Sequence, residues 1–199
     1  TMRKKMLILL SACLLTTACS PKMSGEKIES KDISEYEPSE TTEDTEYAAL
    51  GEIAPDIVVT DLEGNNKQLS EYFGKPTIMV FWATWCGYCK DELPALEMLK
   101  EKYGDNLNIL ALNGGDSAED IKDFMEENNY TFETVMVGIE ESIKFDAQSI
   151  PVTAILDSEG TIEFFTRGSL DAETMFNEYF VPTIDEIFEK DGAENTENA

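Results

Sequence analysis

Histidine is absent from this chain of 199 residues, and basic residues are scarce. Without an imidazole the chain lacks the commonest metal ligand and the usual general base, which argues against zinc hydrolases and Ser-His-Asp triads. Fifteen basic residues stand against 41 acidic ones, and the formal net charge is -26. Because nucleic acids and anionic lipid headgroups repel such a chain, we expect neither as an electrostatic partner.

No apolar run reaches the roughly 20 residues that a membrane-spanning helix needs. The apolar stretch from Met6 to Ala18 is too short, and it follows the basic residues Arg3, Lys4 and Lys5. This arrangement is typical of a secretion signal, which we place at residues 1–19. We therefore expect the mature protein outside the cytoplasm, where disulfides persist.

Cysteine is also rare, and two of the four cysteines lie in this signal segment. The stretch 15–19, Leu-Thr-Thr-Ala-Cys, resembles a bacterial lipobox, in which the cysteine becomes the lipidated first residue. We predict lipidation at Cys19 and thus a lipid anchor in the cell membrane. Thr16 departs from the usual leucine of that motif. Cys13 fits the local pattern better but leaves a very short apolar core, so it remains an alternative, as does secretion without a lipid.

Composition divides the rest of the chain into three parts. Residues 20–47 are rich in Ser, Thr and Glu and cannot bury enough apolar surface to fold, so we expect a disordered acidic tether. Residues 48–190 have the length and apolar content of a single domain. Residues 191–199 are predicted to be a disordered acidic tail.

Strand and helix patterns alternate through residues 48–190. The continuous apolar run 76–82 predicts a strand buried on both faces, and Leu93, Leu96 and Leu99 predict a helix that stops at Gly104. Further strands are expected at 57–59, 107–112 and 132–137, with helical segments at 70–74, after Ser117 and at 140–145. A hairpin over 149–165 and a closing helix over 171–190, broken at Pro182, follow. The class is α/β, with a central mixed sheet flanked by helices.

The remaining cysteines, Cys86 and Cys89, form a C-x-x-C pair. A structural zinc site needs four Cys or His ligands, so only a site completed by carboxylates is conceivable. Haem attachment requires a histidine next, where Lys90 stands. A purely structural disulfide across so short a loop would stabilise little. Redox chemistry is the interpretation left best supported, and it requires no metal or other cofactor.

The pair follows a buried strand and opens a helix. Cys86 then lies at a helix N-terminus, where unpaired N–H groups and the helix dipole stabilise a thiolate nucleophile. Cys89 lies on the same helix face, within reach of a disulfide. We predict that Cys86 attacks a disulfide of a partner protein and that Cys89 resolves the mixed disulfide.

The chain resembles the TlpA/ResA-type thiol-disulfide oxidoreductases of the thioredoxin superfamily. The motifs that carry this resemblance are Ala54-Pro55-Asp56, the hairpin around Gly64, Gly74-Lys75-Pro76, the stretch 81–96 (FWATWCGYCKDELPAL) and Ile150-Pro151. The resemblance implies a thioredoxin-like fold with an N-terminal hairpin extension and a central insertion. It also implies that Cys86 is the exposed nucleophile and Cys89 the buried resolving thiol.

Further roles follow from the resemblance by position. The Ile150-Pro151 bond is expected to be cis and to bind client backbone beside the sulfurs, although a trans proline opening an edge strand is the alternative. Trp85, Gly87 and Tyr88 are expected to contribute to the client-binding surface.

Glu92 stands three residues after Cys89, where ResA-like relatives have a glutamate close to the thiols. A partly buried carboxyl there would accept or return the resolving cysteine's proton. The alternative is a surface glutamate in the first turns of the helix.

Together these features predict a monomeric, lipid-anchored reductant of disulfides in client proteins. A membrane thiol carrier would donate electrons, and apocytochrome c or oxidised repair enzymes are candidate clients. Two alternatives remain. One is a thiol peroxidase, although Ala83 replaces the threonine expected three residues before a peroxidatic cysteine. The other is a docking module that retains the fold without catalysis.

Overall fold

The computed structural model describes residues 47–197. The predicted signal segment, Cys13, Cys19 and nearly all of the predicted tether lie outside the described residues. None of the helices within 47–197 combines the length and the apolar character that crossing a membrane requires.

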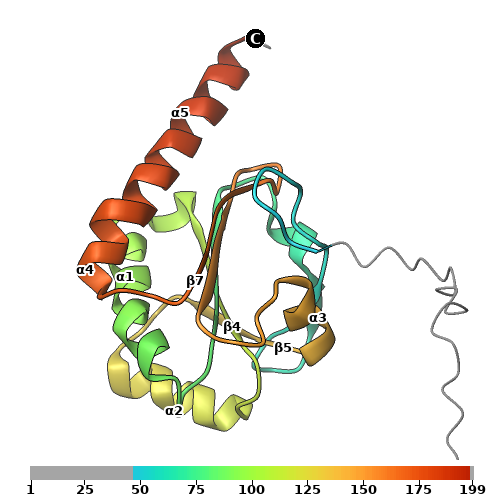
Figure 1. Ribbon diagram of the computed structural model, residues 1–199, viewed down its shortest axis with the longest axis vertical. Helices are drawn as coiled ribbons and strands as arrows, with labels where there is room; N and C mark the ends of the chain where they lie inside the picture. Colours follow the sequence, from blue (N-terminus) through green and yellow to red (C-terminus); the bar gives the residue numbers. More distant parts are fainter. Residues whose placement is uncertain (1–46, 198–199) are drawn as a thin grey trace, which may run out of the picture. The chain divides into compact units, whose positions relative to one another are not determined.

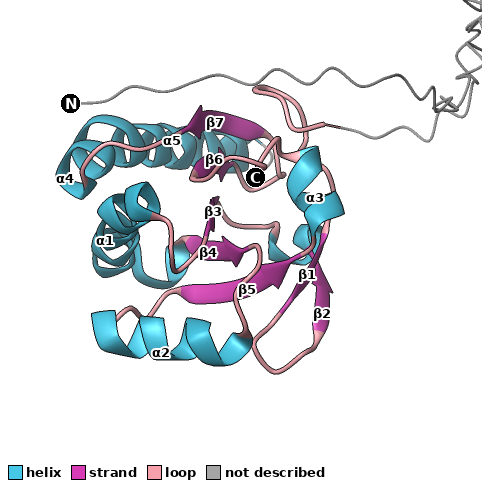
Figure 2. Ribbon diagram, turned by 60° about the horizontal axis from the view of Figure 1, so that its bottom comes forward, coloured by secondary structure: helices cyan, strands magenta, loops and turns pink. Residues whose placement is uncertain are grey.

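Seven strands form one mixed sheet with the order β2-β1-β5-β4-β3-β6-β7 (Figure 2). The strands are β1 (Val58–Thr60), β2 (Asn66–Gln68), β3 (Thr77–Trp82), β4 (Asn108–Asn113), β5 (Glu133–Val137), β6 (Val152–Leu156) and β7 (Ile162–Arg167). Strands β3, β4 and β5 run parallel, whereas β1, β2, β6 and β7 join them in antiparallel pairs. The predicted α/β class, the N-terminal hairpin β1–β2 and the added strand at 132–137 are confirmed.

Helical segments cover both faces of this sheet (Figures 1 and 2). The α-helices are α1 (Gly87–Tyr103), α2 (Ala118–Asn128), α3 (Ile139–Lys144), α4 (Ala172–Thr174) and α5 (Val181–Glu197). Short 3-10 segments occupy η2 (Leu69–Tyr72) and η3 (Gly104–Asn106), and a π-helical segment occupies η4 (Met175–Phe180).

The central strand β3 divides the core into two parts. All six of its residues are buried, as the apolar run predicted, and they alternate between the faces. Ile78, Val80 and Trp82 belong to the core under α1, α2 and the C-terminal helical segments. Met79 and Phe81 belong to the opposite core, with Phe145 at the end of α3. The central strand β3 therefore leads directly from the core to the cysteine pair.

Two features of the C-terminal region differ from the sequence prediction. The helix does not break at Pro182, because the preceding turn widens to π geometry: the Val181 N–H bonds the carbonyl of Phe176. Pro182 follows this widened turn and has no N–H to donate, yet the helical conformation continues through it. In addition, α5 runs to Glu197, past the predicted boundary at residue 190 (Figure 1). Glutamate favours helices, which fits the continuation of α5 into this acidic segment.

Candidate active site

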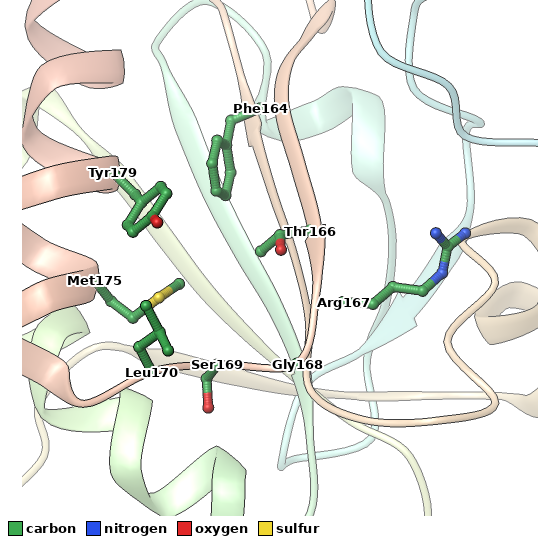
Figure 3. A pocket seen from close by; sticks show the side chains of 8 residues that line it. All are labelled: Phe164, Thr166, Arg167, Gly168, Ser169, Leu170, Met175 and Tyr179. Carbon is green, nitrogen blue, oxygen red and sulfur yellow. The ribbon is translucent and has the colours of Figure 1, made fainter.

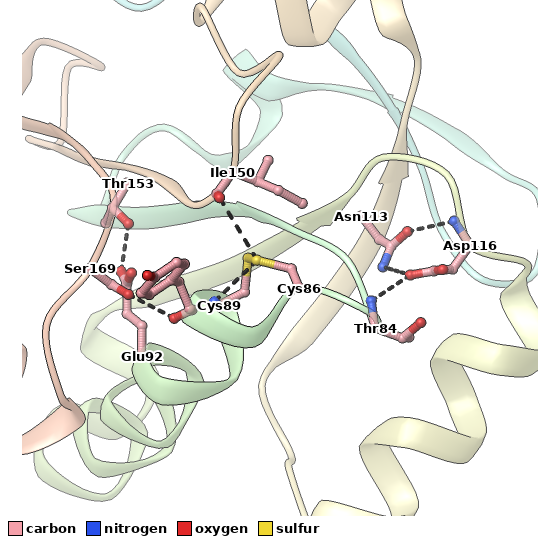
Figure 4. The surroundings of a disulfide bond; sticks show 10 residues. Thr84, Cys86, Cys89, Glu92, Asn113, Asp116, Ile150, Thr153 and Ser169 are labelled. Atoms are coloured by element: carbon pink, nitrogen blue, oxygen red, sulfur yellow. Dashed lines mark hydrogen bonds between the residues drawn. A yellow bond between two sulfur atoms is a disulfide. The ribbon is translucent and has the colours of Figure 1, made fainter.

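Cys86 and Cys89 form a disulfide where β3 passes into α1 (Figure 4). Their Cα atoms lie 5.3 Å apart, so the pair is within bonding reach, as the C-x-x-C spacing predicted. This disulfide is the oxidised form of a two-electron redox couple, whose reduced form is the Cys86/Cys89 dithiol.

Cys86 is the N-cap residue of α1, and its Sγ atom accepts a hydrogen bond from the N–H of Cys89 at 3.1 Å. In the reduced protein the same donor and the helix dipole would stabilise a thiolate on Cys86. Cys89 is fully buried, whereas Cys86 keeps 6% of its surface exposed. Cys86 is thus the more accessible of the two, although it is far less exposed than the family resemblance implied. The carbonyl oxygen of Ile150, 3.8 Å from its sulfur, helps to cover it.

The loop before β6 lies beside the sulfurs. The Ile150-Pro151 peptide bond is cis, as predicted. Pro151 is buried, and the carbonyl of Ile150 faces the sulfur of Cys86 (Figure 4). A client backbone placed beside Cys86 would therefore meet a main-chain acceptor.

Glu92 lies on α1, one turn beyond Cys89, and its side chain is fully buried. This placement contradicts the alternative of a surface glutamate. Its Oε1 atom accepts a hydrogen bond from the Thr153 hydroxyl at 2.5 Å, whereas Oε2 has no hydrogen-bond partner within residues 47–197. Burial raises the pKa of Glu92 to about 7, and the bond from Thr153 only partly opposes that rise. A carboxyl of this kind exchanges a proton near neutral pH.

Comparison with known proteins defines the family. The sequence profile of the AhpC/TSA family matches residues 50–165. The chain belongs to the AhpC/TSA family. A thioredoxin-like protein, YneN of Bacillus subtilis, is 31% identical over 128 residues, which cover 63% of this chain and 75% of YneN. The thiol-disulfide oxidoreductase ResA of Geobacillus kaustophilus is 33% identical over 127 residues, covering 63% and 73% of the two chains.

Solved structures agree with the AhpC/TSA assignment. A thiol:disulfide interchange protein from Bacteroides sp. superimposes with a TM-score of 0.57 at 25% identity, covering 65% of this chain and 87% of that one. StoA from Bacillus subtilis gives a TM-score of 0.51 at 25% identity, with coverage of 62% and 96%. The predicted thioredoxin-like fold and the resemblance to ResA-type thiol-disulfide oxidoreductases are confirmed.

Exposed apolar side chains surround the disulfide of this AhpC/TSA-family chain. Trp85 and Tyr88 are 70% and 71% exposed, although both are large and apolar. Trp85 and Ile150 line a pocket of about 160 Å³ together with Ile139, the first residue of α3. Gly87 begins α1 between Trp85 and Tyr88 and is exposed. Apolar surface of this kind marks a protein-binding area.

A second pocket, of about 230 Å³, lies between β7 and the C-terminal helical segments (Figure 3). Leu170, Met175 and Tyr179 line it, and it adjoins the active-site helix because the Ser169 hydroxyl donates to the Tyr88 carbonyl at 2.7 Å. None of its lining residues is a cysteine or a carboxylate, so we assign the thiol chemistry to the Cys86 region. Within residues 47–197 no cluster of acidic and cysteine side chains has the makings of a metal site.

Three polar residues near the disulfide were not predicted from the sequence. Thr153 holds Glu92, as described above. Asp116, just beyond β4, accepts a hydrogen bond from the backbone N–H of Thr84, two residues before Cys86, and Asn113, the last residue of β4, donates to Asp116 (Figure 4). A signal was available, since β3 and β4 are parallel and polar residues following parallel strands meet at one edge of the sheet.

Proposed function

We propose that this chain reduces disulfides of client proteins outside the cytoplasm through its Cys86/Cys89 pair. The observation that carries the proposal is the position of Cys86 as the N-cap of α1, with its sulfur bonded by the Cys89 N–H and its partner cysteine buried behind it. This arrangement favours one nucleophilic sulfur and one resolving sulfur.

The reaction starts from the dithiol form. The Cys86 thiolate attacks one sulfur of the client disulfide, which forms a mixed disulfide and releases the other client sulfur as a thiolate. Cys89 then loses its proton and attacks the Sγ atom of Cys86. That step releases the second client thiolate and leaves the Cys86–Cys89 disulfide. The client gains two electrons and, after protonation of its thiolates, two protons.

Glu92 is the proposed acceptor for the proton of Cys89. The two residues share a face of α1, three positions apart, and the Oε2 atom of Glu92 is not engaged by any group in residues 47–197. A pKa of about 7 allows the carboxyl to take that proton and later to return it. We assign Glu92 this role in both directions of exchange.

The setting that we propose rests on the sequence. Residues 1–19 would direct export, Cys19 would carry the lipid, and residues 20–47 would tether a monomeric domain to the membrane. A membrane thiol carrier would return two electrons to the disulfide after each turnover. Apocytochrome c thiols or oxidised repair enzymes are the proposed clients. Trp85, Tyr88, Gly87, Ile150 and Pro151 would form the surface that receives them.

Reduction of insulin disulfides tests the reaction. Wild type with a chemical reductant should accelerate insulin precipitation, and Cys86→Ser should abolish the acceleration. Cys89→Ser should accumulate a mixed disulfide with the client, because the resolving sulfur is gone. Equal rates for wild type and Cys86→Ser would refute the proposal and favour a docking module. Turnover dependent on hydrogen peroxide would instead indicate a thiol peroxidase, although buried Ala83 offers no hydroxyl for that chemistry.

A further inference from the structure

A carboxylate from a neighbouring loop holds the segment that carries Cys86. The Oδ2 atom of Asp116 accepts a hydrogen bond from the backbone N–H of Thr84 at 2.6 Å. Asp116 lies between β4 and α2, 32 residues from Thr84 along the chain. The contact therefore joins the turn that ends β3 to a separate part of the fold (Figure 4).

Asp116 is itself held in place by Asn113, the last residue of β4. The side-chain amide N–H of Asn113 donates to Oδ2 of Asp116 at 2.9 Å, and the backbone N–H of Asp116 donates to the side-chain Oδ1 of Asn113 at 3.0 Å. Asn113 is 1% exposed, and it pairs with Trp82 across β3 and β4. The carboxylate is thus fixed to the central strands of the sheet.

The held segment is short and leads directly to the reacting sulfur. Thr84 is followed by Trp85 and Cys86, and the Cys86 N–H bonds back to the carbonyl of Ala83 at 3.1 Å. If the Thr84 N–H lost its acceptor, the turn from residue 83 to residue 86 would lose the backbone hydrogen bond that links it to the β4–α2 loop. The sulfur of Cys86 would then no longer be fixed against Ile150 and the N–H of Cys89.

We propose that Asp116 is a positioning residue for Cys86, acting through its bond to the Thr84 N–H. The hydrogen-bond partners of Asp116 are Thr84 and Asn113 and not the sulfurs, so its role is to keep the turn in the conformation that presents Cys86 at the start of α1. The inference rests on the proposed function, since it assumes exchange at Cys86. Although burial opposes ionisation, the bonds from Thr84 and Asn113 lower the pKa of Asp116, so the carboxylate is charged in the range where exchange is measured.

Two substitutions distinguish an effect of the hydrogen bond on the position of Cys86 from an effect of the charge of Asp116. Asp116→Asn removes the charge, but its amide oxygen still accepts from Thr84 and Asn113. Asp116→Ala removes the charge and the acceptor together. An electrostatic effect on Cys86 would appear equally in both variants, whereas a positioning effect would appear in Asp116→Ala alone.

The readout is reduction of the Cys86–Cys89 disulfide by dithiothreitol, followed by tryptophan fluorescence. A dithiothreitol thiolate attacks Cys86 and displaces the Cys89 thiolate. The second thiolate of the reagent then attacks the reagent's sulfur in the mixed disulfide, which releases the Cys86 thiolate and closes the oxidised ring, a two-electron transfer in all. We expect Asp116→Ala to react about tenfold more slowly than wild type and Asp116→Asn to stay within about threefold. Hydrogen exchange at the Thr84 amide should be slow in wild type and Asp116→Asn and fast in Asp116→Ala.

Equal rates in all three proteins would overturn the proposal, as would equal slowing in both variants. Should Asp116→Ala fail to fold in urea titrations, Asp116→Ser takes its place, because a serine hydroxyl is too short to reach Thr84. The reagent needs no client protein. A wild type that fails to reduce insulin, combined with the expected pattern in dithiothreitol, would therefore refute the proposed function and leave the role of Asp116 intact.

Discussion

The hydroxyl of Thr153 donates a hydrogen bond to Glu92 at 2.5 Å, across 61 positions of sequence. Thr153 belongs to β6, two residues after the cis peptide, and Glu92 belongs to α1, three residues after Cys89. The bond joins the strand that follows the cis peptide to the helix that carries Cys89, at a buried carboxyl. Burial raises the pKa of Glu92, and the hydrogen bond from Thr153 lowers it by a smaller amount, so Thr153 modulates how readily Glu92 ionises.

Replacement of Thr153 by valine should raise the pKa of Glu92. Valine keeps the volume of threonine but removes the donor that lowers this pKa, so the midpoint should move above about 7 by about one unit. The carboxyl carbon chemical shift of Glu92, followed against pH in the oxidised protein, measures the midpoint. Thr153→Ser keeps a hydroxyl and serves as the control. Identical titrations of Thr153→Val and wild type would contradict the assignment.

Glu92 should also make stability depend on pH. Its pKa is about 7 in the folded protein against 4.5 for the ordinary side chain. Below pH 4.5 the carboxyl is protonated in both the folded and unfolded states, so burial of the charge costs nothing. Between these two values the unfolded chain loses the proton while the folded protein keeps it, so stability falls as pH rises. Above about pH 7 both states are ionised, and the full cost, about 3 kcal/mol, remains.

Glu92→Gln tests this account, since glutamine fills the same space without ionising. The variant and wild type should have similar free energies of unfolding near pH 4, and the variant should be more stable by up to about 3 kcal/mol at pH 8. Urea titrations of the oxidised proteins measure both values, and other carboxyls cancel in the difference. Glu92→Gln should also slow thiol exchange, because the acceptor for the Cys89 proton is removed. A constant difference across this range would show that Glu92 ionises as an ordinary carboxyl.

Sequence was sufficient wherever the determining signal is local. The apolar run of β3, the C-x-x-C pair and the leucines of α1 lie within about 25 consecutive residues, and their spacing specifies strand, turn and helix without further information. The cis bond before Pro151 and the buried Glu92 came instead from resemblance to a family. Composition and spacing alone left a trans proline and a surface glutamate open.

Contacts between distant residues were out of reach. The bonds Asp116–Thr84 and Thr153–Glu92 join residues 32 and 61 positions apart, and no local pattern specifies which donor meets which acceptor, even where parallel strands bring polar residues to one edge of the sheet. The exposure of Cys86 depends in the same way on Ile150, which covers the sulfur from another part of the chain. At Pro182 the rule that proline breaks a helix predicted wrongly, because the helix continues through a π turn just before the proline.

Metabolic labelling tests the predicted anchor. Full-length protein made in a bacterial host that processes lipoproteins should incorporate radiolabelled palmitate, and Cys19→Ser should lose the label and the membrane association. Cys13→Ser should keep both. Loss of the label in Cys13→Ser but not in Cys19→Ser would show that Cys13 is the lipidated residue. A wild type without label would contradict the lipid anchor and favour secretion without a lipid.

The apolar surface beside the disulfide should determine client affinity rather than stability. Ile139 is 67% exposed and lines a pocket with Trp85 and Ile150, so its truncation removes contact area from a client without opening a cavity in the core. Ile139→Ala should raise KM for a protein disulfide substrate about fivefold to tenfold with kcat nearly unchanged. The rate with dithiothreitol should stay at the wild-type value, because a small reagent does not need this surface.

Ile53 provides a matched control for Ile139. It is 58% exposed, and its backbone pairs with Thr161, beside the turn at the end of the β6–β7 hairpin opposite to Pro151. Ile53→Ala therefore removes the same atoms from an exposed position away from the sulfurs, and KM should not change. A similar rise in KM for both variants would point to a general loss of apolar surface. A rise for Ile139→Ala alone places the client over α3 and Trp85, so that its disulfide meets Cys86 from that side.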